Sequence, residues 1–185
     1  MNRTKIAVIG TVGIPAKYGG FETLADHLVE ELSGDVDFTV YCTKKKYAKD
    51  QRPATYKGAK LVYLPFDANG IQSIVYDCIS ILHAMFFADV LLILGVSGGI
   101  MLPFVRLFTR KKIIISIDGI EWKRNKWSKA ARLYLFAAEW LAVKFSHADI
   151  SDNESIQDYT AIRYKTLSHI IEYGADHTIA VKPTQ

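Results

Sequence analysis

The stretch KIAVIGTVGIPAKYGGFETLADHLVEELSG, residues 5–34, contains in order a short apolar run, a loop with paired glycines and an amphipathic segment. The run 5–10 is apolar almost throughout rather than alternating, which is typical of a strand covered on both faces. From Phe21 to Leu32 apolar residues recur at helical spacing, and the pattern stops at Gly34, a residue typical of the position just past a helix end. This stretch therefore predicts a strand followed by a crossover helix.

The same alternation continues nearly to the end of the chain. Further short apolar runs lie at 37–42, 60–64, 89–94, 112–117, 147–151 and 168–172. Longer helical patterns separate them, and parallel neighbours need such crossover connections, which are almost always right-handed. We therefore predict an α/β fold with a Rossmann-like, doubly wound parallel sheet.

Two of the helical patterns allow more detailed predictions. In 128–146 the charged residues fall within an arc of about 140° at about 100° per residue, which predicts a charged stripe and an otherwise apolar helix lying against the sheet. The charged residues of this arc are Lys129, Arg132, Glu139 and Lys144. Ser151, followed three residues later by Glu154, predicts a capping box that opens a helix over 152–164.

Composition narrows the classes of protein. The chain has 185 residues, half of them apolar, which is enough for one domain with a well-buried core. Its net charge of +4 is too small for a dedicated nucleic-acid binder, so no nucleic-acid partner is expected. The two cysteines show neither disulfide nor zinc-site spacing, which fits a reducing cytoplasm. The apolar region 74–105 is interrupted by two aspartates and a histidine, without the run of about 18 residues that a membrane span needs.

In an open parallel sheet, ligands bind beyond the carboxyl ends of the strands. The loops expected there are 11–20, 95–99, 118–126, 151–153 and 172–176. The first loop has neither the Gly-x-Gly-x-x-Gly of dinucleotide-binding domains nor the Gly-Lys-Ser/Thr of a P-loop, and no acid ends the second strand to hold a ribose. Gly19 and Gly20 still place backbone N–H groups at a helix start, where they can face an anion; a turn that needs positive φ explains them equally well.

The stretch SIDGIEWKRNKW, residues 116–127, is the second informative loop. Asp118 and Glu121 directly follow a buried strand, where carboxylates can orient sugar hydroxyls or act as a base. Trp122 can pack on the face of a sugar. The alternative is structural, with Asp118 capping a helix and the tryptophan packing in the core.

The same loop is rich in cations. Lys123, Arg124, Lys126 and Trp127 combine positive charge with an aromatic ring, which suits an anionic membrane surface or a pyrophosphate. A solvated basic face is the alternative. The stretch GVSGG, residues 95–99, spells the Gly-x-Ser-x-Gly of hydrolases, but the histidines show no spacing that supports a catalytic triad or a metal site.

Two long motifs, GIPAKYGGFETLADHLV (13–29) and DGIEWKRNKW (118–127), resemble the N-terminal half of GT-B glycosyltransferases of the family-4 type, most closely the bacterial rhamnosyltransferase-like group. The similarity extends over essentially the whole chain. It implies two Rossmann-like domains that face each other across a cleft, with the acceptor bound largely by the first and the nucleotide-sugar by the second. Residues 1–176 would form the first domain, and 177–185 would begin the linker to a missing C-terminal domain.

The resemblance also implies roles for individual residues. Gly19 and Gly20 would approach the donor diphosphate. The residues assigned to the acceptor or the cleft wall are Tyr18, Ser97 and Trp122. No metal is expected for this arrangement, and no cofactor is expected, since the nucleotide-sugar donor is a substrate.

The expected function is that of a retaining glycosyltransferase that moves rhamnose from dTDP-rhamnose onto a lipid-linked saccharide, at the cytoplasmic face of the membrane, in cell-surface polysaccharide synthesis. Asp118 and Glu121 are the catalytic candidates, although many family members carry a histidine where this chain has Asp118. The resemblance places the Glu-x7-Glu motif that holds the donor in the second domain, which these 185 residues would lack, so the chain by itself is expected to be inactive. The alternatives are a stand-alone nucleotide- or saccharide-binding module and an NAD(P)-linked oxidoreductase.

Overall fold

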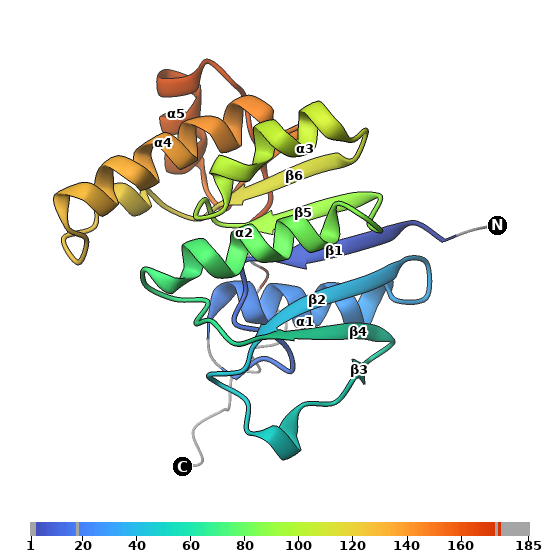
Figure 1. The fold of residues 1–185 in the computed structure, drawn as a ribbon. Helices are drawn as coiled ribbons and strands as arrows, with labels where there is room; N and C mark the ends of the chain where they lie inside the picture. The colour runs from blue at the N-terminus through green and yellow to red at the C-terminus, as the bar shows by residue number, and fades with distance from the viewer. Residues whose placement is uncertain (1–2, 18, 173, 175–185) are drawn as a thin grey trace, which may run out of the picture.

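The computed structural model describes residues 3–17, 19–172 and 174. These residues form an eight-stranded sheet with helices on both faces (Figure 1). The strands are β1 (Lys5–Ile9), β2 (Asp37–Thr43), β3 (Thr55–Tyr56), β4 (Ala59–Leu64), β5 (Val90–Leu94), β6 (Lys112–Ile117), β7 (Ala148–Ser151) and β8 (His169–Ile170). The helices are α1 (Gly20–Leu32), α2 (Gln72–Ala84), α3 (Leu102–Phe108), α4 (Lys129–Phe145) and α5 (Glu154–Tyr164), with 3₁₀ turns η1 (Lys49–Gln51), η2 (Gly99–Met101) and η3 (Glu121–Lys123).

The sheet is parallel except at one edge. Its order is β3-β4-β2-β1-β5-β6-β7-β8, and within the described residues only β3 runs antiparallel to its neighbour. The chain first builds outward from β1 through β2 to β4, and then returns to place β5 on the other side of β1. Because the order reverses between β1 and β5, the loops after these strands diverge and leave a crevice. The predicted Rossmann-like, doubly wound sheet is confirmed.

Helices lie on both faces of the sheet, as right-handed crossovers require. Figure 1 shows α2, α3 and α4 on the face toward the viewer and α1 on the far face. In β1, Ala7 and Ile9 belong to the core under α2, α3 and α4, whereas Val8 belongs to the core under α1. Burial on both faces is the reason that the strands read as unbroken apolar runs.

The predicted capping box at the start of α5 is wrong. The N-cap is Asn153, whose side-chain oxygen accepts the Ile156 N–H at 3.0 Å. Ser151 is instead the last residue of β7, and its buried hydroxyl lies 2.6 Å from Ser168 Oγ. Strand pairing of β7 with β6 and β8 extends to Ser151, so this residue is not available as a cap.

The predicted charged stripe of α4 is wrong at Glu139, which is completely buried. Its Oε1 accepts hydrogen bonds from the hydroxyls of Tyr159 and Tyr164 on α5. The charge pattern of one helix does not reveal its neighbours, and α5 covers the flank of α4 on which Glu139 lies. The two tyrosine donors satisfy Oε1, as buried polar groups generally require, whereas the buried Oε2 has no hydrogen-bond partner among the described residues.

The edges of the sheet differ from expectation in length. β8 spans only His169–Ile170, shorter than the expected 168–172. Between β2 and β4 the chain forms η1 and the short hairpin strand β3, without an α-helix.

Across the described ranges, no helix is both long and apolar enough to cross a bilayer.

Candidate functional site

A cavity of about 170 Å³ opens at the carboxyl edge of the sheet, where the strand order reverses. The loops that follow β1, β4, β5 and β6, together with the start of α2, form its walls. The lining residues are Gly10, Phe21, Ala68, Asn69, Gly70, Ser73, Asp77, Leu94, Gly95, Val96, Ser97, Ile117, Asp118, Gly119, Glu121, Arg124, Lys126 and Trp127. Open α/β sheets bind ligands at this position, so the cavity is the candidate site.

The loop between β6 and α4 supplies one wall, with Glu121 at its centre. Glu121 Oε2 lies 2.9 Å from Arg124 Nε, and its Oε1 lies 2.9 Å from both Lys126 Nζ and Trp127 Nε1. The cations are about half exposed, so each ion pair contributes less than about 1 kcal/mol to stability. The network instead fixes the positions of two cations and an indole at the cavity rim.

Asp118 follows β6 and lies at the mouth of the cavity. Its side chain reaches solvent, yet the surrounding walls displace enough water to raise the pKa of the carboxyl above its usual range, while the Arg124 guanidinium acts in the opposite direction. Asp152, in the loop after β7, adds a like charge that raises this pKa further. A carboxyl in this setting can accept a hydrogen bond from a ligand hydroxyl or, when protonated, donate one.

Asp77 of α2 lines the cavity from its buried side. Asp77 is 3% exposed, and its Oδ1 has no hydrogen-bond partner among the described residues. Burial raises the pKa of this carboxyl well above its usual range. Nearby, the hydroxyls of Ser73 and Ser97 lie 3.1 Å apart. Carboxyl and hydroxyl groups that face one small cavity suit a ligand with several hydroxyls.

Sequence reasoning missed this part of the site. The loops selected from the sequence leave out 65–71, which follows β4 and contributes residues 68–70 to the lining, and no motif marked Ser73 or Asp77. A signal was present, because PFDANG (65–70) is rich in turn-forming residues and directly follows an expected parallel strand. The carboxyl ends of all parallel strands meet at one edge, so this loop belonged with the others.

The loop between β1 and α1 directs its polar groups inward. Glu22, 8% exposed in the first turn of α1, accepts the Val12 N–H at 2.8 Å. Gly19 has a φ of 122°, and a Cβ at this residue would overlap Glu22 Oε2. The positive φ is the main reason that this position favours glycine, and the Glu22 carboxylate packs against it. Neither Gly19 nor Gly20 lines the cavity, although Phe21 does.

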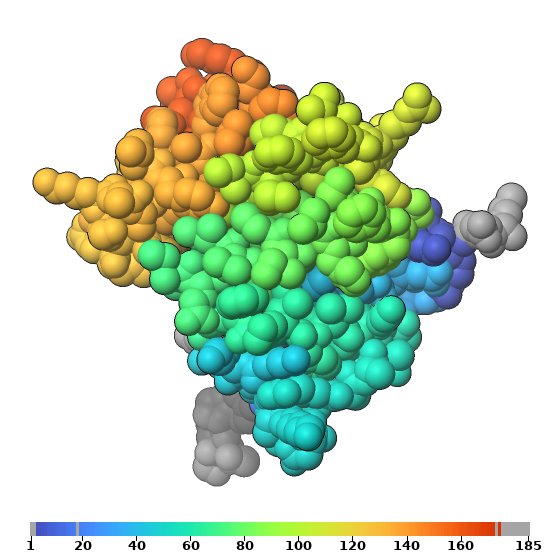
Figure 2. Space-filling model, viewed as in Figure 1, coloured from blue at the N-terminus to red at the C-terminus, as the bar shows by residue number. Residues whose placement is uncertain are grey.

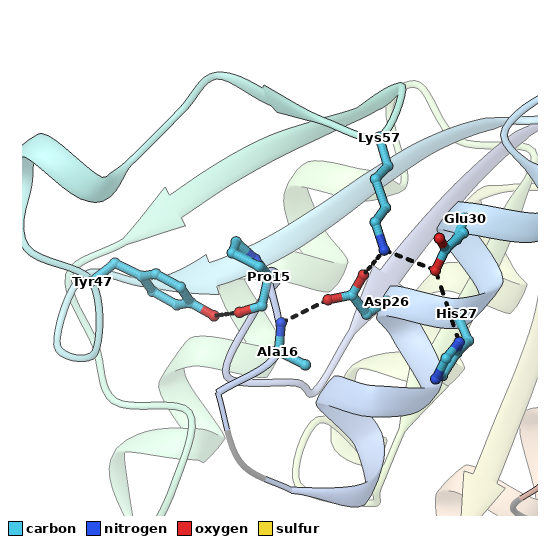
Figure 3. Close-up of polar contacts among 7 residues, drawn as sticks. All are labelled: Pro15, Ala16, Asp26, His27, Glu30, Tyr47 and Lys57. Carbon is cyan, nitrogen blue, oxygen red and sulfur yellow. Dashed lines mark hydrogen bonds and ion pairs between the residues drawn. The ribbon is translucent and has the colours of Figure 1, made fainter. Parts of the chain in front are cut away.

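Figure 3 shows how the rest of this loop is held. Asp26 Oδ2 accepts the Ala16 N–H at 2.8 Å, and its Oδ1 lies 2.8 Å from Lys57 Nζ in the β3–β4 turn. The Tyr47 hydroxyl donates to the Pro15 carbonyl oxygen at 3.0 Å. The helical half of the first long motif therefore anchors the loop that precedes it.

The GVSGG stretch has a packing explanation. The Ser97 carbonyl oxygen accepts a hydrogen bond from the Tyr134 hydroxyl at 2.7 Å. The turn approaches α4 so closely that a Cβ at Gly99 would overlap the carbonyl oxygen of Ala138. None of the histidines in the described part of the chain lines the cavity, so these residues supply no imidazole base for a hydrolase triad there, and His177 lies outside the described residues.

Trp122 and Lys123 face away from this cavity. The Trp122 Nε1–H donates to the Tyr159 hydroxyl at 3.0 Å, and the indole meets the Phe136 ring edge to face. Lys123 lines a separate open groove of about 570 Å³ between α4 and α5. Trp122 is therefore not part of the lining of this cavity, because its contacts with α4 and α5 hold the indole elsewhere.

The structure brings together six of the residues selected from the sequence. Those lining the cavity are Ser97, Asp118, Glu121, Arg124, Lys126 and Trp127. Tyr18 and residues 177–185 lie outside the described residues. Within the described ranges, no group of three or more His, Cys, Asp or Glu side chains is arranged to hold a metal ion.

Comparisons with known proteins relate the chain to one family and one fold. The profile of DUF1972, a domain of unknown function, matches residues 3–176. No curated protein sequence matches the chain. Sucrose-phosphate synthase from Thermosynechococcus elongatus is similar in structure, with a TM-score of 0.59 and 14% identity over 90% of this chain and 46% of its own. UGT89C1 from Arabidopsis thaliana, complexed with UDP-L-rhamnose, gives a TM-score of 0.56 and 13% identity over 95% of this chain and 52% of its own.

The chain therefore spans about half the length of these two solved structures. At such identities the shared property is the fold. The eight-stranded α/β domain matches one half of a GT-B glycosyltransferase.

Proposed function

Because the chain belongs to the DUF1972 family and has the fold of one GT-B half, we propose that it is the acceptor-side domain of a retaining glycosyltransferase. The reaction transfers a sugar from a nucleotide-sugar, with rhamnose from dTDP-rhamnose as the proposed donor. The acceptor is a lipid-linked saccharide at the cytoplasmic face of the membrane, in cell-surface polysaccharide synthesis. A second domain of the same protein completes the site.

One observation supports this proposal above the others. The cavity lies at the switch point of the sheet and presents carboxyls, hydroxyls, cations and an indole edge, the mixture that recognises a saccharide. Asp118 and Glu121 contact acceptor hydroxyls in this proposal. Ser97 and the buried Asp77 contact the hydroxyls that reach deepest. Trp127, held by Glu121, packs against a sugar face.

The donor diphosphate is proposed to lie against the start of α1. There the free amides of the first helical turn and the positive end of the helix dipole favour an anion. Gly19 and Gly20 lie at this helix start, beside the cavity-lining Phe21. The buried Glu22 carboxylate opposes an anion at this position, and Arg124 and Lys126 across the cavity favour one.

The donor class has independent support from the shared fold. The similar structure of UGT89C1 was determined with UDP-L-rhamnose. The match spans 52% of the UGT89C1 chain, so this chain corresponds to about half of that protein. Transfer needs donor and acceptor held together, so we expect turnover from the complete protein and none from this domain alone.

The test uses the protein expressed from its complete reading frame, in which we expect a second domain with Glu-x7-Glu. It is incubated with dTDP-rhamnose, UDP-rhamnose or UDP-glucose and a lipid-linked saccharide extract, and products are identified by mass spectrometry. Asp118→Ala should lower kcat/KM about 100-fold, because a hydrogen bond to the reacting region is lost. Asp35→Ala, an exposed carboxylate in the α1–β2 turn, is the matched control and should leave kinetics unchanged.

Unchanged kinetics for Asp118→Ala would remove this residue from the site without contradicting the transferase assignment, which depends on the measured products. Two other results would contradict the assignment itself. Saccharide or nucleotide binding without transfer by the complete protein would favour a binding module. Tight NADPH binding would favour the oxidoreductase alternative instead.

A further inference from the structure

Helix α2 is apolar on its outer, exposed side. Its buried residues face the sheet, whereas Ile71, Val75, Leu82 and Phe86, at or flanking the helix, are exposed. At about 100° per residue these four fall on a single stripe opposite the buried one. A helix that covers a sheet in water normally has a polar outer stripe, so this one is expected to meet another apolar surface.

The neighbouring helices continue this outer surface. In α3, Phe104, Leu107 and Phe108 are exposed, and in α4, Leu133 and Trp140 are exposed. Each set lies opposite the residues that its helix buries. α3 packs against α4, and α2 contacts the η2 turn that opens α3. Figure 2 shows this face of the molecule, on which α2, α3 and α4 adjoin one another.

The charge on this face has one sign. The acids within the described α2, α3 and α4 are Asp77 and Glu139, and both are buried. Between residues 90 and 147 the chain has ten lysines and arginines against three acids, a formal +7, while the rest of the chain carries −3. Arg110 and Lys112 follow α3, and Lys129 begins α4. An apolar surface with flanking cations and no exposed carboxylate on its helices complements an apolar surface that is rimmed by negative charge.

We propose that the outer face of α2, α3 and α4 docks onto an anionic lipid bilayer. The exposed apolar side chains enter the boundary between headgroups and acyl chains, and the flanking cations contact anionic headgroups. The inference goes beyond sugar transfer and does not depend on it. It also has a consequence for the cavity, because Ile71 directly follows Asn69 and Gly70 of the cavity lining. A lipid-borne molecule would therefore reach the cavity along the start of α2.

This surface differs from the membrane contact expected from the sequence, which consisted of Lys123, Arg124, Lys126 and Trp127. Arg124 and Lys126 pair with Glu121 at the cavity, and Trp127 donates to the same carboxylate. These three side chains therefore form the rim of the cavity together with Glu121. The docking contacts are assigned instead to the helices.

The test is sedimentation of the purified protein with two kinds of vesicle, phosphatidylcholine alone and phosphatidylcholine with about one third phosphatidylglycerol. The first variant, Leu107→Gln with Phe108→Gln, changes side chains that are 76% and 68% exposed, so folding should be unaffected. Binding to the anionic vesicles should fall at least about tenfold, because two inserted side chains are lost. The matched control is Leu32→Gln with Leu167→Gln, two exposed apolar residues outside these helices, and should bind as the parent does.

A second variant, Arg110→Gln with Lys112→Gln, tests the charge. It should weaken binding to the anionic vesicles about fivefold per cation and leave binding to phosphatidylcholine unchanged. The proposal would be overturned if the parent protein did not sediment with anionic vesicles. It would also be overturned if Leu107→Gln with Phe108→Gln bound these vesicles as well as the control variant, Leu32→Gln with Leu167→Gln. If Leu107→Gln with Phe108→Gln instead converts a dimer to a monomer in analytical ultracentrifugation and vesicles are not bound, a second copy covers the face and the proposal fails.

Discussion

The loops that follow β1 and β6 reach the same edge of the sheet but use their polar residues in opposite ways. In the β1–α1 loop, the carboxylates of Glu22 and Asp26 accept hydrogen bonds from the loop's own backbone amides. In the β6–α4 loop, Asp118 and Glu121 line an open cavity. The first loop is anchored by its own helix, whereas the second presents its carboxylates to the cavity.

The difference teaches that a long, specific sequence motif can record folding requirements as well as ligand contacts. Glycine at position 19 and glutamate at position 22 form one packing unit, since the carboxylate occupies the space that a Cβ would take. In the second loop, Glu121 pairs with the cations Arg124 and Lys126 instead. The predictions below test this contrast, in order of decreasing effect.

The largest effect is expected at Gly19. Gly19→Ala places a Cβ at a φ of 122° and against Glu22 Oε2, so it should lower the free energy of unfolding by about 3 kcal/mol. Gly119→Ala in the second loop is the matched control, because the nearest atom to its Cβ would be Arg124 Nη2 at 3.7 Å. It should change stability by less than about 0.5 kcal/mol. Urea denaturation measures both, and equal losses would end the contrast between the loops.

The second prediction concerns Asp77 and pH. Burial raises the pKa of this carboxyl in the folded protein, so folding takes up a proton between the unfolded and folded pKa values. The contribution of Asp77 to the free energy of unfolding is therefore fully present below the pKa of the unfolded state. It falls by about 1.4 kcal/mol per pH unit as the pH rises between the unfolded and the folded pKa values. Asp77→Asn should make the loss of stability between pH 4.5 and 8 shallower, as followed by thermal denaturation. An unchanged slope would show that Asp77 is ionised in the folded protein.

The third prediction removes one anchor of the first loop. Tyr47→Phe deletes the hydroxyl that donates to the Pro15 carbonyl oxygen and should cost about 1 kcal/mol of stability. Tyr56→Phe, a partly exposed tyrosine of β3 whose ring lies near Lys57, is the control and should cost less than about 0.5 kcal/mol. Both are measured by urea denaturation. A Tyr47→Phe protein as stable as the control would indicate that the loop does not need this anchor.

The smallest effect is expected at Glu22, and it tests whether the first loop also faces a ligand. Glu22→Gln keeps an oxygen that can accept the Val12 N–H but removes the negative charge beside the start of α1. If a diphosphate binds there, the affinity for dTDP or UDP should rise about threefold, because a repulsion is relieved. Calorimetric titration of the complete protein gives the affinity. An unchanged dissociation constant would place the diphosphate elsewhere and leave the loop purely structural.

Much of the fold was predictable because it depends on patterns that repeat locally. The runs at 5–10, 37–42 and 112–117 are strands, and the crossover helix after Gly20 is present. The site was predictable where it follows a predicted strand, as at Asp118 and Glu121. Ser73 and Asp77 were missed because they lie within a helical pattern, where nothing distinguishes a residue facing a cavity from one facing the core.

The sequence by itself determined the alternation of the parallel strands with helices, the doubly wound class and the edge of the sheet at which the cavity opens, because apolar periodicity and turn chemistry are local properties. Tertiary structure alone decided which polar groups share a space. Glu139 is buried because α5 covers that flank of α4, and Trp122 is held behind its loop by contacts with α4 and α5. Glu22 meets Gly19 because the loop folds back onto the helix that follows it. Side-chain neighbours of this kind depend on how separate elements pack, and periodicity within one element does not contain that information.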